Sequence, residues 1–147
     1  MKLHVVWITA RRNKESAARE LTEEYTKRLS RFVTIEARDM TSEAALIKLL
    51  QSVRSAPFVV LLDSRGKQFT SEEFAGFIDA HQTRGTQTML FAVGPADGFS
   101  EQMLKAANQL LSLGKMTLPH ELARVVLLEQ LYRAFTIINN HPYHGGH

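Results

Sequence analysis

Short strand-like segments alternate with helical segments along this chain, and that order restricts the fold more than any other feature. The strand-like segments are rich in β-branched or aromatic residues, and they are residues 3–9, 32–38, 58–63 and 88–93. The segments between them carry apolar residues at helical spacing, as in the stripe of Ala18, Leu21, Tyr25 and Leu29. The alternation predicts an α/β fold, a mostly parallel sheet with helices on both faces.

Helix-capping residues support the same order. Thr41-Ser42, Thr70 and Ser100 each precede acidic residues that suit the first turn of a helix, and the last of these helices should run from 101 to about 109. The chain has 147 residues, which suits a single domain over 1–147.

The C-terminal third departs from this alternation. Residues 110–113 resemble a fifth strand, 114–119 a loop, and Pro119 suits the first turn of a helix that runs over about 120–139. That helix is apolar nearly all round, so it is buried either in its own domain or against a partner. We favour a partner subunit, because a domain this small has little interior for an enclosed helix.

Three loops lie where a parallel sheet binds its ligands, beyond the carboxyl ends of strands. They are residues 62–67, 93–98 and 113–118. None contains a phosphate-binding glycine motif, and the chain has no G-x-S-x-G nucleophile turn. The loops therefore mark a ligand site without identifying the ligand.

Composition excludes several classes of function. The chain has no cysteine, which removes thiolate nucleophiles, disulfides, zinc fingers and iron–sulfur clusters. No apolar run approaches the ~20 residues of a membrane helix, so we expect no membrane partner and a cytoplasmic protein. The net charge is +3, and its excess lies in residues 1–40, around Arg11, Arg12, Lys14, Lys27, Arg28 and Arg31. This run is either an ordinary solvated helix face or a surface that contacts phosphates.

Histidines gather in the tail, at His141, His144 and His147. Because no HExxH motif occurs and no carboxylate lies near them in sequence, we expect no metal site. The Tyr143-His144 pair is better suited to stacking on a base and moving a proton.

A set of short motifs appears in order along most of the chain. The segments are Leu62-Asp63-x-x-Gly66-Lys67, Ser71-Glu72-Glu73-Phe74-Ala75, Val93-Gly94-x-x-x-Gly98, Leu111-Ser112-Leu113-x-x-Met116-Thr117-Leu118-Pro119-His120, Arg124-Val125, Glu129-Gln130-Leu131-Tyr132-Arg133-Ala134 and Pro142-Tyr143-His144. The stretches at 116–120 and 129–134 are the most specific. In these residues the chain resembles the ribosomal RNA large-subunit methyltransferase H family of the SPOUT superfamily.

The resemblance implies a parallel α/β fold whose C-terminal part forms a trefoil knot, an exception to unknotted topology. It also implies a homodimer that holds S-adenosylmethionine in a bent form in the knot. The expected substrate is ring nitrogen 3 of a pseudouridine in 23S (large-subunit) ribosomal RNA, within the assembled ribosome. Position by position, the expected cofactor contacts are Leu62, Gly94, Pro95, Leu113, Gly114, Lys115, Met116, Thr117 and Leu118.

The sequence departs from the family pattern at two places. The family usually has two adjacent glycines where Gly94-Pro95 stands here, and proline has a carbonyl but no N–H to offer a ligand. The family also usually ends in Tyr-His followed by Lys or Arg, whereas Gly145-Gly146-His147 follows here. A phosphate-binding cation is therefore missing from the end, unless His147 is protonated.

Methylation of a protonated imide nitrogen requires a base or strong electrostatic help. Our hypothesis assigns His144 as the base and Tyr143 as the residue that positions the target ring. Arg124 and Arg133 would stabilise negative charge on the ring carbonyls. The alternatives are that His144 only binds phosphate and that Arg133 only pairs with Glu129.

Two other functions remain open. One is a non-catalytic RNA- or ribosome-binding module with a SPOUT fold, which Pro95 and the altered terminus favour. The other is a flavodoxin-like binder of small molecules or phosphate, which the apolar C-terminal helix disfavours.

Overall fold

The computed structural model describes residues 1–9 and 16–145, and in this part of the chain five strands alternate with five helices. Their bounds are β1 Lys2–Ile8, α1 Ala17–Leu29, β2 Thr34–Met40, α2 Glu43–Ser52, β3 Phe58–Gln68, α3 Ser71–Thr83, β4 Thr88–Val93, α4 Glu101–Ala106, β5 Gln109–Ser112 and α5 His120–Ile138. Arg11, Arg12, Lys14, Gly146 and His147, about which the sequence raised hypotheses, lie outside the described residues.

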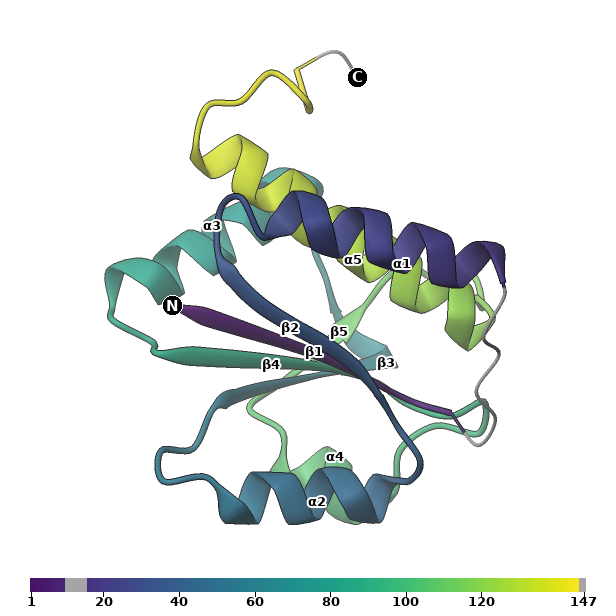
Figure 1. Cartoon of the computed structure of the whole chain (residues 1–147). Coiled ribbons are helices and arrows are strands. Elements are labelled where there is room, and N and C mark those ends of the chain that lie inside the picture. The colour runs from purple at the N-terminus through teal and green to yellow at the C-terminus, as the bar shows by residue number, and fades with distance from the viewer. Residues whose placement is uncertain (10–15, 146–147) are drawn as a thin grey trace.

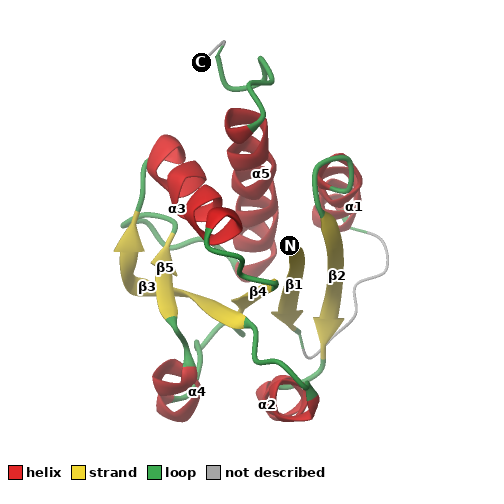
Figure 2. Ribbon diagram, turned by 90° about the vertical axis from the view of Figure 1, so that its left-hand side faces the viewer, coloured by secondary structure: helices red, strands yellow, loops and turns green. Residues whose placement is uncertain are grey.

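The strands form one parallel sheet in the order β2-β1-β4-β3-β5. Helices α1, α3 and α5 cover one face and α2 and α4 the other (Figures 1 and 2). The predicted α/β class, with helices on both faces of a parallel sheet, is confirmed.

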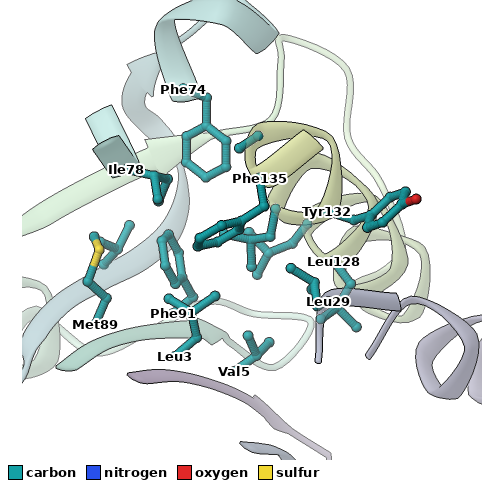
Figure 3. Packing of buried hydrophobic residues seen from close by; sticks show 14 of the residues in the cluster. Leu3, Val5, Leu29, Phe74, Ile78, Met89, Phe91, Leu128, Tyr132 and Phe135 are labelled. Carbon is teal, nitrogen blue, oxygen red and sulfur yellow. The ribbon is translucent and has the colours of Figure 1, made fainter. Parts of the chain in front are cut away.

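Alternating residues of each strand supply two apolar layers. Leu3 and Val5 of β1 point to the layer beneath α1, α3 and α5, whereas Val6 and Ile8 belong to the layer beneath α2 and α4. In the first layer the ring of Phe135, from α5, lies among Phe91, Leu128 and neighbouring side chains (Figure 3).

Strand β3 extends further than the sequence predicted. Residues 62–67 were expected to form a loop, but β3 continues to Gln68 and pairs with β5 a second time. Leu62 and Lys67 both pair with Leu111, so residues 63–66 form an excursion between two stretches of ladder. The loop prediction was wrong because pairing with a later strand cannot be read from local residue types.

The excursion brings Gly66 against the backbone of β5. A Cβ atom at position 66 would lie 2.6 Å from the carbonyl carbon of Leu110 and from the amide nitrogen of Leu111. Only glycine allows this approach.

Helix α4 ends at Ala106, not at about 109 as predicted. Asn108 explains the difference, because its backbone N–H donates to the Val59 carbonyl at 2.9 Å and its side-chain oxygen accepts from the Val59 N–H at 2.7 Å. This clamp to β3 ends the helix and starts β5.

Helix α5 is largely buried by its own chain. It lies over the sheet between α1 and α3 (Figure 2), and Leu127, Leu128, Leu131 and Phe135 are fully buried there. The prediction that a partner subunit buries this helix was therefore wrong for most of its surface. Pro119 precedes the helix as its N-cap residue and is not in the first turn.

No helix among the described residues is both long and apolar enough to cross a membrane.

Candidate active site

One cavity of about 250 Å³ lies beyond the carboxyl ends of β3, β4 and β5. All nine residues that the sequence assigned to the cofactor line it, although they come from three separate segments. They are Leu62, Gly94, Pro95, Leu113, Gly114, Lys115, Met116, Thr117 and Leu118. The sheet topology thus brings all of these positions together, as parallel strands do at their carboxyl edge.

The wall after β4 is a tight turn. The Pro95 carbonyl accepts a hydrogen bond from the N–H of Gly98 at 2.9 Å, and Phe99 packs against Gly94. A Cβ atom at Gly94 would lie 3.0–3.2 Å from the Phe99 ring. Because a carbonyl oxygen has two lone pairs, the Pro95 carbonyl retains an acceptor site for a ligand.

The wall after β5 is held by Ser112. Its Oγ donates to the Gly114 carbonyl at 3.0 Å and lies 3.2 Å from the Gly114 N–H. Gly114 has φ = +143°, a conformation that side chains rarely adopt. Beyond this turn Met116 is 86% exposed.

The cavity combines apolar surface with charged groups of both signs. Leu62, Leu113 and Leu118 supply the apolar surface, Lys115 supplies a cation, and Asp63 supplies a carboxylate that is paired with Arg65. Hydrogen bonding from the Arg65 side chain is the main cause that lowers the pKa of Asp63, so this carboxylate is ionised at neutral pH. The volume lies just below the ~300–1,000 Å³ usual for ligand pockets.

A second cluster forms where the C-terminal tail meets α5. The Arg133 guanidinium donates to Glu129 Oε1 through Nε at 3.0 Å and through Nη2 at 2.6 Å. Tyr143 donates its hydroxyl to the same oxygen at 3.1 Å. The imidazole of His144 lies between two charged side chains. Its Nδ1 is 2.9 Å from Arg133 Nη1, and its Nε2 is 2.8 Å from Glu72 Oε1.

This cluster gives distinct chemical roles to Tyr143 and His144. Burial is the main cause that raises the pKa of the Tyr143 phenol, and Tyr25 and Glu129 add to it. Tyr143 therefore stays protonated and donates a hydrogen bond. The imidazole of His144, by contrast, is held between Arg133 and Glu72.

The alkaline stability of the protein is expected to depend on Tyr143. In the unfolded chain its phenol ionises near pH ~10, whereas the folded chain keeps it protonated to a higher pH. The raised pKa therefore stabilises the fold below pH ~10, and this contribution is lost as the pH rises further. Urea unfolding below and above pH ~10 should show a steeper loss for the wild type than for Tyr143→Phe; equal losses would contradict the assignment.

The two sites lie at opposite ends of α5. Ala123 lines the cavity at the carboxyl edge of the sheet, near the start of the helix, whereas His144 follows its end. At 1.5 Å per residue, the helix alone spans roughly 22 Å from Ala123 to Ile138. Figure 1 shows the tail leaving the helix at the end away from the carboxyl edge of the sheet. The structure therefore brings Arg133, Tyr143 and His144 together, and places Arg124 apart from them, near the start of α5.

Several residues of these sites were not assigned from the sequence. Glu72 and Gln130 join the tail cluster, and Gln130 also accepts from Ser71 Oγ at 2.8 Å. The only feature of the sequence that could have indicated these two residues is that they lie within the motifs at 71–75 and 129–134. Ala123 and His120 line the cavity at the carboxyl edge, and the position of His120 beside the third loop was a usable signal.

Among residues 1–9 and 16–145, no group of three or more His, Asp or Glu side chains is arranged to hold a metal ion.

Comparison with known proteins places the chain in a family. The family model described as "Predicted SPOUT methyltransferase" matches residues 1–144. The chain is 59% identical over 148 residues to "Ribosomal RNA large subunit methyltransferase H" of Koribacter versatilis, with both chains fully covered. It is 40% identical over 154 residues to the protein of the same name from Citrifermentans bemidjiense, covering 98% of this chain and 99% of that one.

Solved structures share the fold. A probable methyltransferase from Bordetella pertussis Tohama I has a TM-score of 0.57 at 10% identity and covers 90% of this chain and 93% of its own. A probable methylase family protein from Haemophilus influenzae has a TM-score of 0.55 at 12% identity, covering 98% of this chain and 69% of its own. The family model and the full-length relatives together establish that the chain belongs to the ribosomal RNA large subunit methyltransferase H family of SPOUT methyltransferases.

Proposed function

We propose that this protein is an S-adenosylmethionine-dependent methyltransferase of large-subunit ribosomal RNA. The observation that carries the proposal is the convergence of nine residues from three separate segments on one cavity at the carboxyl edge of the sheet. The family of the chain supports the reaction, and the names of its relatives support the substrate. The finer proposal is methylation of ring nitrogen 3 of a pseudouridine in 23S RNA, on the assembled cytoplasmic ribosome.

When bound, S-adenosylmethionine supplies an activated methyl group. Apolar side chains of the cavity would hold its adenine, and backbone groups near Pro95 and Gly114 would fix its orientation. In the trefoil-knot arrangement that we propose for residues 1–147, the β3 excursion and the 113–118 segment would form the knotted part around this ligand.

We also propose that the working unit is a homodimer. In one chain, the length of α5 separates the tail cluster from the cofactor cavity by more than a hydrogen bond can bridge. A second copy in the opposite orientation would bring its tail to this cavity. Met116, Leu118 and Leu122, which are 86%, 37% and 48% exposed, provide apolar surface near the cavity for such a contact.

In this arrangement the tail supplies the acid–base chemistry. His144 would take the imide proton of the target ring on Nδ1 once that atom releases Arg133, and Tyr143, whose hydroxyl donates to Glu129, would position the ring. Arg133, which Glu129 holds in place through two hydrogen bonds, would stabilise the negative charge that develops on the ring carbonyls.

Two measurements test the proposal. Titration calorimetry should show S-adenosylmethionine binding, and methyl transfer should occur on ribosomes in preference to free RNA, with the methyl group mapped to a pseudouridine. If the cofactor fails to bind, the non-catalytic RNA- or ribosome-binding module becomes the better interpretation. If the methyl group is found on another base, the coarser function stands and the finer one fails.

A further inference from the structure

A larger cavity, of about 520 Å³, lies beside the cofactor cavity. It is bounded by one face of α1, the ends of β1 and β2, and the first turn of α5. His120 lines both cavities, so their walls meet at the start of α5. A polymer whose reacting base enters the cofactor cavity would therefore have this second space within reach of its neighbouring nucleotides.

Arg124 is the distinctive side chain of this cavity. The residue is only 8% exposed, and its Nε donates to Thr22 Oγ1 at 2.9 Å. The Thr22 hydroxyl in turn donates its hydrogen to the Ala18 carbonyl at 2.7 Å. A lone pair of the Thr22 oxygen is therefore available to accept the hydrogen bond from Arg124. The guanidinium carbon lies 4.6 Å from the centre of the Trp7 ring. These contacts hold the guanidinium in one place.

No carboxylate of the described residues forms an ion pair with Arg124, even though its charge is nearly buried. Burial costs a charged group much of its hydration, and an anion that binds to it recovers part of this cost. Its terminal Nη atoms make no hydrogen bond to a described residue, so they retain their donors for a ligand. Desolvation is the main cause that lowers the pKa of Arg124, and the carboxylates of Glu121 and Asp39 oppose this effect without pairing with it.

Two further cations of the cavity wall lack a carboxylate partner. Lys27 forms no ion pair with any described residue, and the Nε of Arg38 is buried without a hydrogen-bond partner. Arg19, by contrast, is paired with Glu23 at 3.3 Å. The wall also holds the carboxylates of Asp39 and Glu121 and the hydroxyls of Thr26 and Ser30. Such a mixed wall suits a ligand that has an anionic group as well as hydrogen-bond donors.

We propose that this second cavity binds a nucleotide of the RNA substrate next to the one that is methylated, with Arg124 contacting its phosphate. The proposal rests on the function proposed above, and it assigns Arg124 to substrate binding in place of charge stabilisation on the target ring. The volume lies within the ~300–1,000 Å³ of ligand pockets, and the contact to RNA would be charge-assisted and sensitive to salt.

Trp7 makes the proposal testable, because it is the only tryptophan in the chain and it contacts Arg124. The probe is a synthetic RNA hairpin from the large-subunit ribosomal RNA, titrated at several salt concentrations. Binding should change the Trp7 fluorescence. Arg124→Gln should weaken binding about tenfold and lower the slope of log K against log salt by roughly one unit, as expected for one lost phosphate contact.

Two other variants complete the test. Lys27→Gln, at an exposed position, should weaken binding in the same direction and decides the matter if Arg124→Gln does not fold. Arg54→Gln removes an equal charge from an exposed position after α2, on the other face of the sheet, and should leave affinity and slope unchanged.

The proposal is overturned if the folded cavity variants bind RNA with wild-type affinity and salt slope. It is also overturned if Arg124→Gln changes the dissociation of a dimer and leaves RNA binding unchanged, because the cavity would then receive a second copy. Calorimetry with S-adenosylmethionine on the same wild-type sample separates this failure from that of the proposed function, since the cofactor binds at the other cavity.

Discussion

Mixing two inactive variants of this protein is expected to restore methyl transfer. His144→Ala removes the proposed base and leaves the cofactor cavity intact, so its rate should fall by about 10²–10⁴. Gly94→Val forces bulk between the cavity wall and the buried ring of Phe99, 3.0 Å from even a Cβ atom, and the displaced wall should abolish cofactor binding. Each variant lacks a different half of the site.

Only a site shared between protomers predicts recovery. In a mixed dimer, the intact cavity of the His144→Ala chain faces the intact tail of the Gly94→Val chain. With random exchange at equal concentrations, half of the dimers are mixed and each has one complete site, so about one quarter of wild-type activity should return. Methyl transfer to ribosomes, measured before and after exchange of subunits, checks this expectation.

Two matched samples control the experiment. Each variant mixed with more of itself should stay inactive. In a mixture of either variant with wild type, dimers that contain one chain of each kind should form, which shows that subunits exchange. If exchange occurs and no activity returns, the tail serves the cavity of its own chain and the shared site is wrong.

Replacing Gly66 with alanine is expected to destabilise the fold severely. The new Cβ would lie 2.6 Å from backbone atoms of Leu110 and Leu111, and a backbone cannot rotate away as a side chain can. Overpacking costs typically ~1–3 kcal/mol, and this site should reach the upper end at about 3 kcal/mol. For a chain of this size the midpoint of thermal unfolding should fall by roughly 10 °C.

Gly76 provides the matched control. It lies in α3, is exposed, and a Cβ atom there would meet nothing within 4 Å. Gly76→Ala should therefore raise stability by about 0.5–1 kcal/mol, since alanine has the better helix propensity. Calorimetry on both variants tests the pair, and a Gly66→Ala protein as stable as wild type would mean that β5 moves away from the β3 excursion.

The sequence predicted the parts of this fold that depend on local residue patterns. Strand β4 begins and ends where its apolar run does, and Thr70 caps α3 through a reciprocal hydrogen-bond pair with Glu73. The nine cofactor residues were assigned by resemblance, and a parallel topology is sufficient to bring their three segments to one edge of the sheet.

Long-range contacts account for the parts that it missed. The second pairing of β3 with Leu111 depends on a strand more than forty positions later, and the end of α4 depends on the clamp between Asn108 and Val59. The partner of His144 was missed for the same reason, because Glu72 lies on α3 and is 72 positions away in sequence. The hydrophobic pattern showed that α5 is buried, and it did not show that α1 and α3 bury it.

The burial of α5 within its own chain separates folding from assembly. The hydrophobic core is made of residues of one chain, so we expect folding to be a first-order event and formation of the proposed dimer to be second-order in protein concentration. Dilution would then uncouple the two, leaving intact folded subunits whose cavities have lost their neighbour's tail. The amount of enzyme in the cell would set the fraction of active sites as well as their number.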